Sequence, residues 1–80
     1  TMEISEILND YITNEFLEDK LETVSYDDDL LSTGILDSIG MIRFISFIEK
    51  EFNIHVSSED MTFDNFMSIE KITDYIQKKK

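Results

Sequence analysis

The sequence predicts an all-α fold, a small four-helix bundle that occupies residues 1–80 as a single domain. Apolar residues recur at helical spacing in three separate stretches, and the chain contains no proline to interrupt them. The apolar fraction of 41% argues against disorder, and 80 residues suffice for one small core. We therefore expect three longer helices, a short third helix, and a long loop between helices one and two.

The first helix is predicted from Glu3 to Glu18. Apolar side chains recur along one face of it, and polar residues occupy the opposite face. This apolar stripe is interpreted as a core face. Its members are Ile4, Ile7, Leu8, Tyr11, Ile12 and Phe16.

A long connection, residues 19–37, follows the first helix. A loop of this length in so small a domain is expected to be functional or to be fixed by its own apolar residues. Leu21 and Val24 are expected to extend the packing. The anchors expected further along are Leu30, Leu31, Ile35 and Leu36. The three aspartates at 27–29 lack the spacing and terminal glutamate of a calcium loop, so they predict a solvated turn.

The second helix is predicted from Ser38 to Phe52 and is the most apolar of the chain. Its expected core stripe comprises Met41, Phe44, Ile45, Ile48 and Phe52. Further apolar residues lie outside that stripe, and the domain is too small to enclose a helix completely. Ile39 and Ile42 are therefore interpreted as a docking surface. Phe47 is expected to pack against the fourth helix or the long loop.

The path of residues 53–67 is the least determined part of the prediction. Ile54 and Val56 alternate with polar residues, so both are expected to face inward. One short helix or two half-turns are expected between residues 61 and 67. Its candidate caps are Ser58 and Thr62, and its expected inward anchors are Phe63 and Phe66.

The fourth helix is predicted to begin after Ser68, a good N-cap. Its apolar residues at helical spacing are Ile69, Ile72, Tyr75 and Ile76. Three lysines at 78–80 end the chain, where positive charge suits the carboxyl end of a helix dipole.

The charge balance restricts the partners. A net charge of −11 makes nucleic acid an improbable ligand, because phosphates repel such a surface. It favours partners with basic docking patches, unless the acidity serves solubility alone. No stretch is long and apolar enough to span a bilayer, and no cysteine is present. We expect a cytoplasmic monomer.

An enzymatic site is not assembled by this sequence. A Ser-His nucleophile pair would need His55 near Ser38, but the predicted second helix separates them by roughly 20 Å. His55 is the only histidine and has no cysteine to share a metal with, so it is interpreted as exposed, and no metal site is predicted. The chain is expected not to be an enzyme.

The strongest motif is the junction at Ser38. Asp37 is a candidate N-cap, and an anion tethered to Ser38 would meet the unpaired amides and positive dipole end of the helix. Gly40 lies one turn inside, where glycine costs about 1 kcal/mol relative to alanine. Either a side chain there would obstruct a prosthetic group or partner, or a frayed first turn tolerates glycine.

Residues 34–40, Gly-Ile-Leu-Asp-Ser-Ile-Gly, resemble the attachment motif of acyl carrier proteins. The helix order and the long loop extend the resemblance over nearly the whole chain. It implies that Ser38 bears a covalent 4'-phosphopantetheine arm, delivered from coenzyme A by a phosphopantetheinyl transferase, which holds an acyl group as a thioester. A ligase or acyltransferase with a basic docking patch would load it. The implied partner interface comprises Asp37, Ile39, Gly40, Ile42 and Arg43, and the candidate acyl pocket comprises Met41, Phe44 and Ile45.

The type of carrier depends on the residues after the serine. Fatty-acid carriers usually place acidic residues in the first turns of this helix, whereas this chain has Gly40 and Arg43. Residues 33–40 are more similar to the stand-alone D-alanyl carrier proteins and their relatives, which receive an activated amino acid or acid from an adenylating ligase. A housekeeping fatty-acid carrier is the alternative. An unmodified acidic helical domain that only binds a partner is the alternative from another class.

Overall fold

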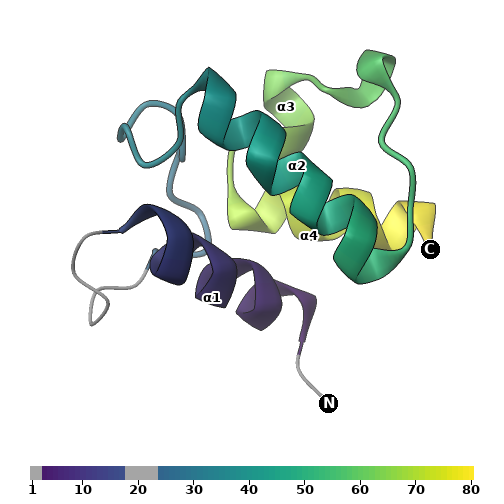
Figure 1. Ribbon diagram of the computed structural model, residues 1–80, viewed down its shortest axis with the longest axis horizontal. Coiled ribbons are helices and arrows are strands. Elements are labelled where there is room, and N and C mark those ends of the chain that lie inside the picture. The colour runs from purple at the N-terminus through teal and green to yellow at the C-terminus, as the bar shows by residue number, and fades with distance from the viewer. Residues whose placement is uncertain (1–2, 18–23) are drawn as a thin grey trace.

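The computed structural model describes residues 3–17 and 24–80 and shows only helices as regular structure within them (Figure 1). The four α-helices and one short 3₁₀ helix, in chain order, are α1 (Ile4–Phe16), α2 (Ser38–Phe52), η1 (Ser58–Asp60), α3 (Phe63–Phe66) and α4 (Ile69–Lys79). Both α1 and α3 pack on α4, and α2 crosses in front of α4 in this view. The predicted all-α bundle with a short third helix is confirmed.

One core joins the helices to the long connection. The side chains buried in it are Leu8, Ile12, Val24, Leu30, Leu36, Phe44, Ile45, Ile48, Val56, Phe66, Ile69, Ile72, Tyr75 and Ile76. The predicted stripes of the longer helices therefore do face inward. Of their remaining members, Ile4, Tyr11, Phe16, Met41 and Phe52 are partly buried against the core, and Ile7 is half-buried outside it. Helix α1 ends at Phe16; its predicted end, Glu18, and the predicted contact of Leu21 lie outside the described residues.

Phe47 differs from the prediction. Its ring stacks on Tyr11 of α1, with centroids 3.9 Å apart, and not on α4 or the long loop. Phe44 stacks on the same tyrosine at 5.6 Å. Helix α1 lies close enough to α2 for a tyrosine to fill the gap, and helical periodicity alone does not reveal which neighbour an off-stripe aromatic residue meets.

The long connection is fixed mainly by Leu30 and Leu36, which are buried as predicted. The backbone N–H of Leu30 donates to Met67 O at 2.8 Å, just before α4. Leu31 was expected to be an anchor as well, but it is exposed, because Leu30 already points into the core and its neighbour projects outward. The aspartates form a turn: the Asp29 carboxylate accepts from the amides of Leu31 and Ser32, each at 3.0 Å.

Residues 53–68 follow a compact path around α3. Asn53 adopts a left-handed conformation that ends α2, and Val56 is buried, as predicted. Thr62 caps α3 by accepting from the Asn65 amide at 3.3 Å, whereas Ser58 lies inside η1 and caps nothing. Phe66 is buried, but the prediction for Phe63 was wrong, since that ring is 49% exposed. A one-turn helix has only one buried side, and Phe66 occupies it.

Candidate functional site

The site begins where the long connection becomes α2. Asp37 is extended, and its Oδ1 accepts from the Gly40 amide at 2.6 Å while its carbonyl accepts from the Met41 amide at 2.8 Å. These two bonds fix the first helical residue as Ser38. The predicted N-cap is therefore confirmed.

Ser38 is exposed, and no hydrogen bond from another described residue engages its hydroxyl. The amides of Ser38 and Ile39 have no hydrogen-bond partner in the described part of the chain either, so they leave partial positive charge at this end of α2. A hydroxyl that is open to solvent and adjoins such amides fits the attachment of a phosphodiester-linked group. A modifying enzyme can reach it without unfolding the domain.

Gly40 is buried, and its position has a packing explanation. An added Cβ would lie 3.1 Å from Asp37 Oδ1 and 3.2 Å from Cε1 of Phe16, the last residue of α1. Glycine thus lets the end of α1 and the capping carboxylate approach the first turn of α2 together. This contact corrects the assignment of Gly40 to the partner interface, because a buried glycine offers no side-chain surface to a partner.

Exposed apolar side chains flank the serine. Ile39 is 71% exposed and Ile42 is 63% exposed. Residues 38–48 contain no aspartate or glutamate, although the chain as a whole carries a net charge of −11. We call Ser38, Ile39 and Ile42 the docking face, after the role predicted for them; its exposed isoleucines make it apolar, and the exposed Asp37 adjoins it.

Arg43 is the single arginine of the chain and lies beside the docking face. Its Nη2 is 3.5 Å from Glu15 Oε1, and its guanidinium lies 5.3 Å from the ring centroid of Phe16. Both contacts belong to α1. Because both side chains of the ion pair remain largely exposed, the pair holds Arg43 only weakly.

A small apolar pocket of about 150 Å³ lies between α2, α3 and the long connection. We call it the α2–α3 pocket, and its lining residues are Leu31, Met41, Ile45, Met61, Thr62, Phe63 and Phe66. Met41 and Ile45, two of the three candidate pocket residues, line it. The third, Phe44, does not, because it is fully buried in the core on the α1 side.

Five of the lining residues were not predicted from the sequence as members of a pocket: Leu31, Met61, Thr62, Phe63 and Phe66. They come from two segments that flank α2 in space but are distant from each other in the chain. The only sequence signal was an excess of large apolar residues in irregular segments. That signal was interpreted as anchoring, and it does not distinguish a buried side chain from one that lines an open pocket.

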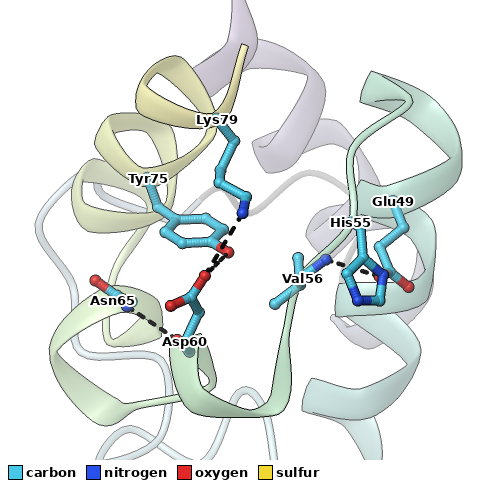
Figure 2. Close-up of polar contacts among 7 residues, drawn as sticks. All are labelled: Glu49, His55, Val56, Asp60, Asn65, Tyr75 and Lys79. Atoms are coloured by element: carbon cyan, nitrogen blue, oxygen red, sulfur yellow. Dashed lines mark hydrogen bonds and ion pairs between the residues drawn. The ribbon is translucent and has the colours of Figure 1, made fainter.

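The remaining polar groups do not build a catalytic centre with Ser38. His55 is exposed and follows the opposite end of α2, where its Nδ1 lies 3.4 Å from Glu49 Oε2 (Figure 2). The 15 residues of α2 rise about 1.5 Å each, so roughly 20 Å separate Ser38 from His55. Among the described residues, no three histidine, cysteine or acidic side chains are grouped so that they could hold a metal ion.

Comparison with known proteins decides the family. Residues 12–76 match the family described as phosphopantetheine attachment site. The chain belongs to this family. Its members carry a covalent 4'-phosphopantetheine and act as carriers rather than as enzymes, so the chain is a carrier protein with that cofactor.

The relatives of this carrier include three proteins of Streptococcus pyogenes named D-alanyl carrier protein, from serotype M5 (strain Manfredo), serotype M49 (strain NZ131) and serotype M1. Each is 32% identical to it over 76 residues, which cover 95% of this chain and 94% of the relative. The similarity therefore extends over the whole bundle. In the described residues, no helix is both long and apolar enough to cross a membrane.

Proposed function

We propose that residues 1–80 form a stand-alone carrier of the D-alanyl type and that Ser38 is its attachment serine. The observation that carries the proposal is the exposed Ser38 hydroxyl at the capped start of α2, with no competing hydrogen bond among the described residues. No other described serine combines exposure with the first position of a long helix. The similarity to proteins named D-alanyl carrier protein covers 95% of this chain and supports D-alanine as the cargo.

Two features of the site favour a small cargo over a fatty acid. The first turn of α2 contains no acidic residue, unlike the pattern expected of fatty-acid carriers. The α2–α3 pocket measures about 150 Å³, half the lower end of the roughly 300–1,000 Å³ typical of sites for drug-sized ligands. A short acyl or aminoacyl group suits this volume better than a long alkyl chain does.

The docking face also indicates which partner enzymes we expect. A phosphopantetheinyl transferase and an adenylating ligase would both contact the docking face, with Asp37 and Arg43 at its edges. The net charge of −11 favours enzymes whose surroundings are basic. Met41 and Ile45 are the proposed pocket residues on α2. A monomeric state and a cytoplasmic location stay predictions.

Mass spectrometry tests the attachment directly. The protein is incubated with coenzyme A and a promiscuous phosphopantetheinyl transferase, and its intact mass is measured. We expect one 4'-phosphopantetheine adduct on the wild type and on Ser46→Ala, which removes an exposed serine from the same helix. Ser38→Ala should remain unmodified. An unmodified wild type beside a modified positive-control carrier would favour a domain that only binds a partner.

A second assay tests the cargo. The modified protein is incubated with ATP, a D-alanine-activating ligase and D-alanine, and the thioester is detected by mass. Parallel reactions offer L-alanine, or a fatty acid with a fatty-acyl ligase. Efficient loading with D-alanine supports the proposal; loading with the fatty acid alone would show that the housekeeping alternative is right.

A third assay tests the docking face. Ile39→Glu places a charge on an exposed side chain and should slow loading by the cognate enzymes while leaving the melting temperature unchanged. Gln77→Glu, which adds the same charge at an exposed position of α4, serves as the control and should load normally. A large fall in the melting temperature of Ile39→Glu would contradict the exposed placement of Ile39.

A further inference from the structure

The segment that forms one wall of the α2–α3 pocket is attached to α4 by a polar cluster (Figure 2). Asp60 ends η1, and its Oδ2 accepts a hydrogen bond of 2.6 Å from the Tyr75 hydroxyl. The Nζ of Lys79 lies 3.7 Å from the same oxygen. Figure 2 shows both side chains reaching from α4 toward Asp60. One carboxylate thus joins two elements that are 15 residues apart in the chain.

The backbone carbonyl of Asp60 also accepts hydrogen bonds from the segment that follows it. Its carbonyl accepts from Asn65 Nδ2 at 2.9 Å and from the Thr62 amide at 2.8 Å. Thr62 in turn caps α3 through the Asn65 amide. These bonds connect the turn and α3 into one unit, so residues 60–66 should shift together if Asp60 is released.

This unit carries most of one pocket wall. Four of its residues line the α2–α3 pocket, namely Met61, Thr62, Phe63 and Phe66. Only Phe66 is buried, against Tyr75 at a centroid distance of 5.2 Å, whereas Met61 and Phe63 are each about half exposed. The wall is therefore attached through Phe66 and the Asp60 cluster, both of which contact α4.

We propose that Asp60 and Tyr75 form a latch that positions residues 60–66 and so sets the width of the α2–α3 pocket. Both are positioning residues, since neither touches the attachment serine. Opening the latch would enlarge the pocket beside α2, and closing it would restrict the carrier to a small cargo. The link to cargo size rests on the proposed function, but the positioning role does not.

The chemistry of the pair suits a latch that stays closed at neutral pH. Burial, together with the hydrogen bond to Asp60, raises the pKa of Tyr75 to about 12, so its hydroxyl remains a donor. The hydrogen bond from Tyr75 in turn lowers the pKa of Asp60, so its carboxylate remains an acceptor. A hydrogen bond between a hydroxyl and an ionised carboxylate is short and among the stronger ones in proteins.

Amide hydrogen exchange on the unmodified protein tests the positioning role. Tyr75→Phe removes the hydroxyl and keeps the ring against Phe66. We expect the amides of Asn65 and Phe66 to exchange about tenfold faster, the size expected for the loss of one charge-assisted hydrogen bond, while protected amides of α1 and α2 change less than about twofold. Tyr11→Phe is the matched control, because it removes a hydroxyl from α1 and should leave residues 60–66 unchanged.

Two outcomes would overturn the latch. The first is exchange in residues 60–66 that stays within about twofold of wild type. The second is exchange that rises equally in α1, α2 and α3, which is the signature of general destabilisation. Because these measurements use the unmodified protein, they are independent of whether Ser38 is loaded or with what.

A probe of pocket size completes the test. Benzene and naphthalene are titrated separately, and the methyl resonances of Met41 and Met61 are followed by NMR. We expect wild type to respond to benzene alone and Tyr75→Phe to respond to both. A wild type that already accepts naphthalene, or a variant that still excludes it, would contradict the claim that the latch sets the pocket width.

Discussion

The two ends of α2 are built in opposite ways. At the amino end, the Asp37 side chain caps α2 locally by accepting from the Gly40 amide, and Ile39 and Ile42 project into solvent. At the carboxyl end, Glu49 reaches forward along the chain, where its Oε2 accepts from the buried Val56 amide at 2.9 Å (Figure 2). At the far end a polar side chain therefore connects separate segments through a hydrogen bond of 2.9 Å. On the serine side the contact between Arg43 and Glu15 is longer, at 3.5 Å, and both of its side chains are largely exposed.

The difference shows how a small domain combines a fixed shape with an open surface. Hydrogen bonds between segments restrain the chain where its path is irregular and must be held. Near Ser38 the capping hydrogen bond stays within the first turn of α2. The exposed side chains of Ile39 and Ile42 are therefore not covered by polar groups of the same chain. A partner enzyme would find a surface there that requires little rearrangement.

The largest expected change in the free energy of unfolding distinguishes the buried face of α2 from its exposed face. Ile48 is fully buried, so Ile48→Ala should lower the free energy of unfolding by about 2–5 kcal/mol through lost burial and a residual cavity. Ile42→Ala removes the same atoms from an exposed position and should change it by less than about 0.5 kcal/mol. Urea unfolding measures both. Similar values for the two variants would show that the faces are misassigned.

The next largest change in stability distinguishes the two ends of α2. Glu49→Ala leaves the buried Val56 amide without its acceptor and should cost about 1–3 kcal/mol, with Glu51→Ala as an exposed control. Asp37→Ala removes the N-cap and should cost about 1 kcal/mol, whereas Asp37→Asn retains a good cap and should cost less. Thermal unfolding ranks the four variants. If Asp37→Ala is the most destabilised, the local cap matters more than the connection between segments.

A further prediction concerns alkaline pH. The pKa of Tyr75 is raised from 10.0 to about 12 in the folded protein, so the fold holds this proton more tightly than the unfolded chain does. The corresponding stability is fully present below pH 10 and is lost as the pH rises from about 10 to about 12. Urea unfolding at a series of pH values should show this loss, and Tyr75→Phe should show a shallower one. Parallel curves would contradict the burial of the hydroxyl.

The smallest expected effect is at the edge of the docking face. Arg43→Gln breaks a largely exposed ion pair with Glu15 and a cation–π contact with Phe16, so it should cost less than about 1 kcal/mol. The cost should shrink further in high salt, because exposed ion pairs are screened. A loss of several kcal/mol would mean that Arg43 is a structural connection between α1 and α2 and is not available to a partner.

Much of the fold was predictable because its signals are local. The bounds of α2, Ser38 to Phe52, follow from an apolar stripe of helical period and from an aspartate at the cap position. The capping role of Ser68 at α4 follows in the same way, and its Oγ accepts from the Lys71 amide at 3.2 Å. Exposure of Ile39 and Ile42 was predictable too, since one small core cannot cover every side of its most apolar helix.

Contacts between segments could not be predicted in the same way. The stacking of Phe47 on Tyr11 depends on how α1 lies against α2. The reason for Gly40 depends on Phe16, which no local pattern brings to the first turn of α2. The bond between Asp60 and Tyr75 likewise depends on how the irregular segment returns to α4. Sequence periodicity gives the direction a side chain faces, but not the partner that it meets there.

The acid-free stretch at residues 38–48 has a kinetic consequence. A carrier has to leave each enzyme as readily as it reaches it. Carboxylates spread over the rest of the molecule would accelerate the first encounter with the basic partner enzyme that we propose, through long-range attraction. Since none of these carboxylates lies in residues 38–48, few ion pairs have to break there when the complex dissociates. A fast association rate therefore does not require a slow dissociation rate.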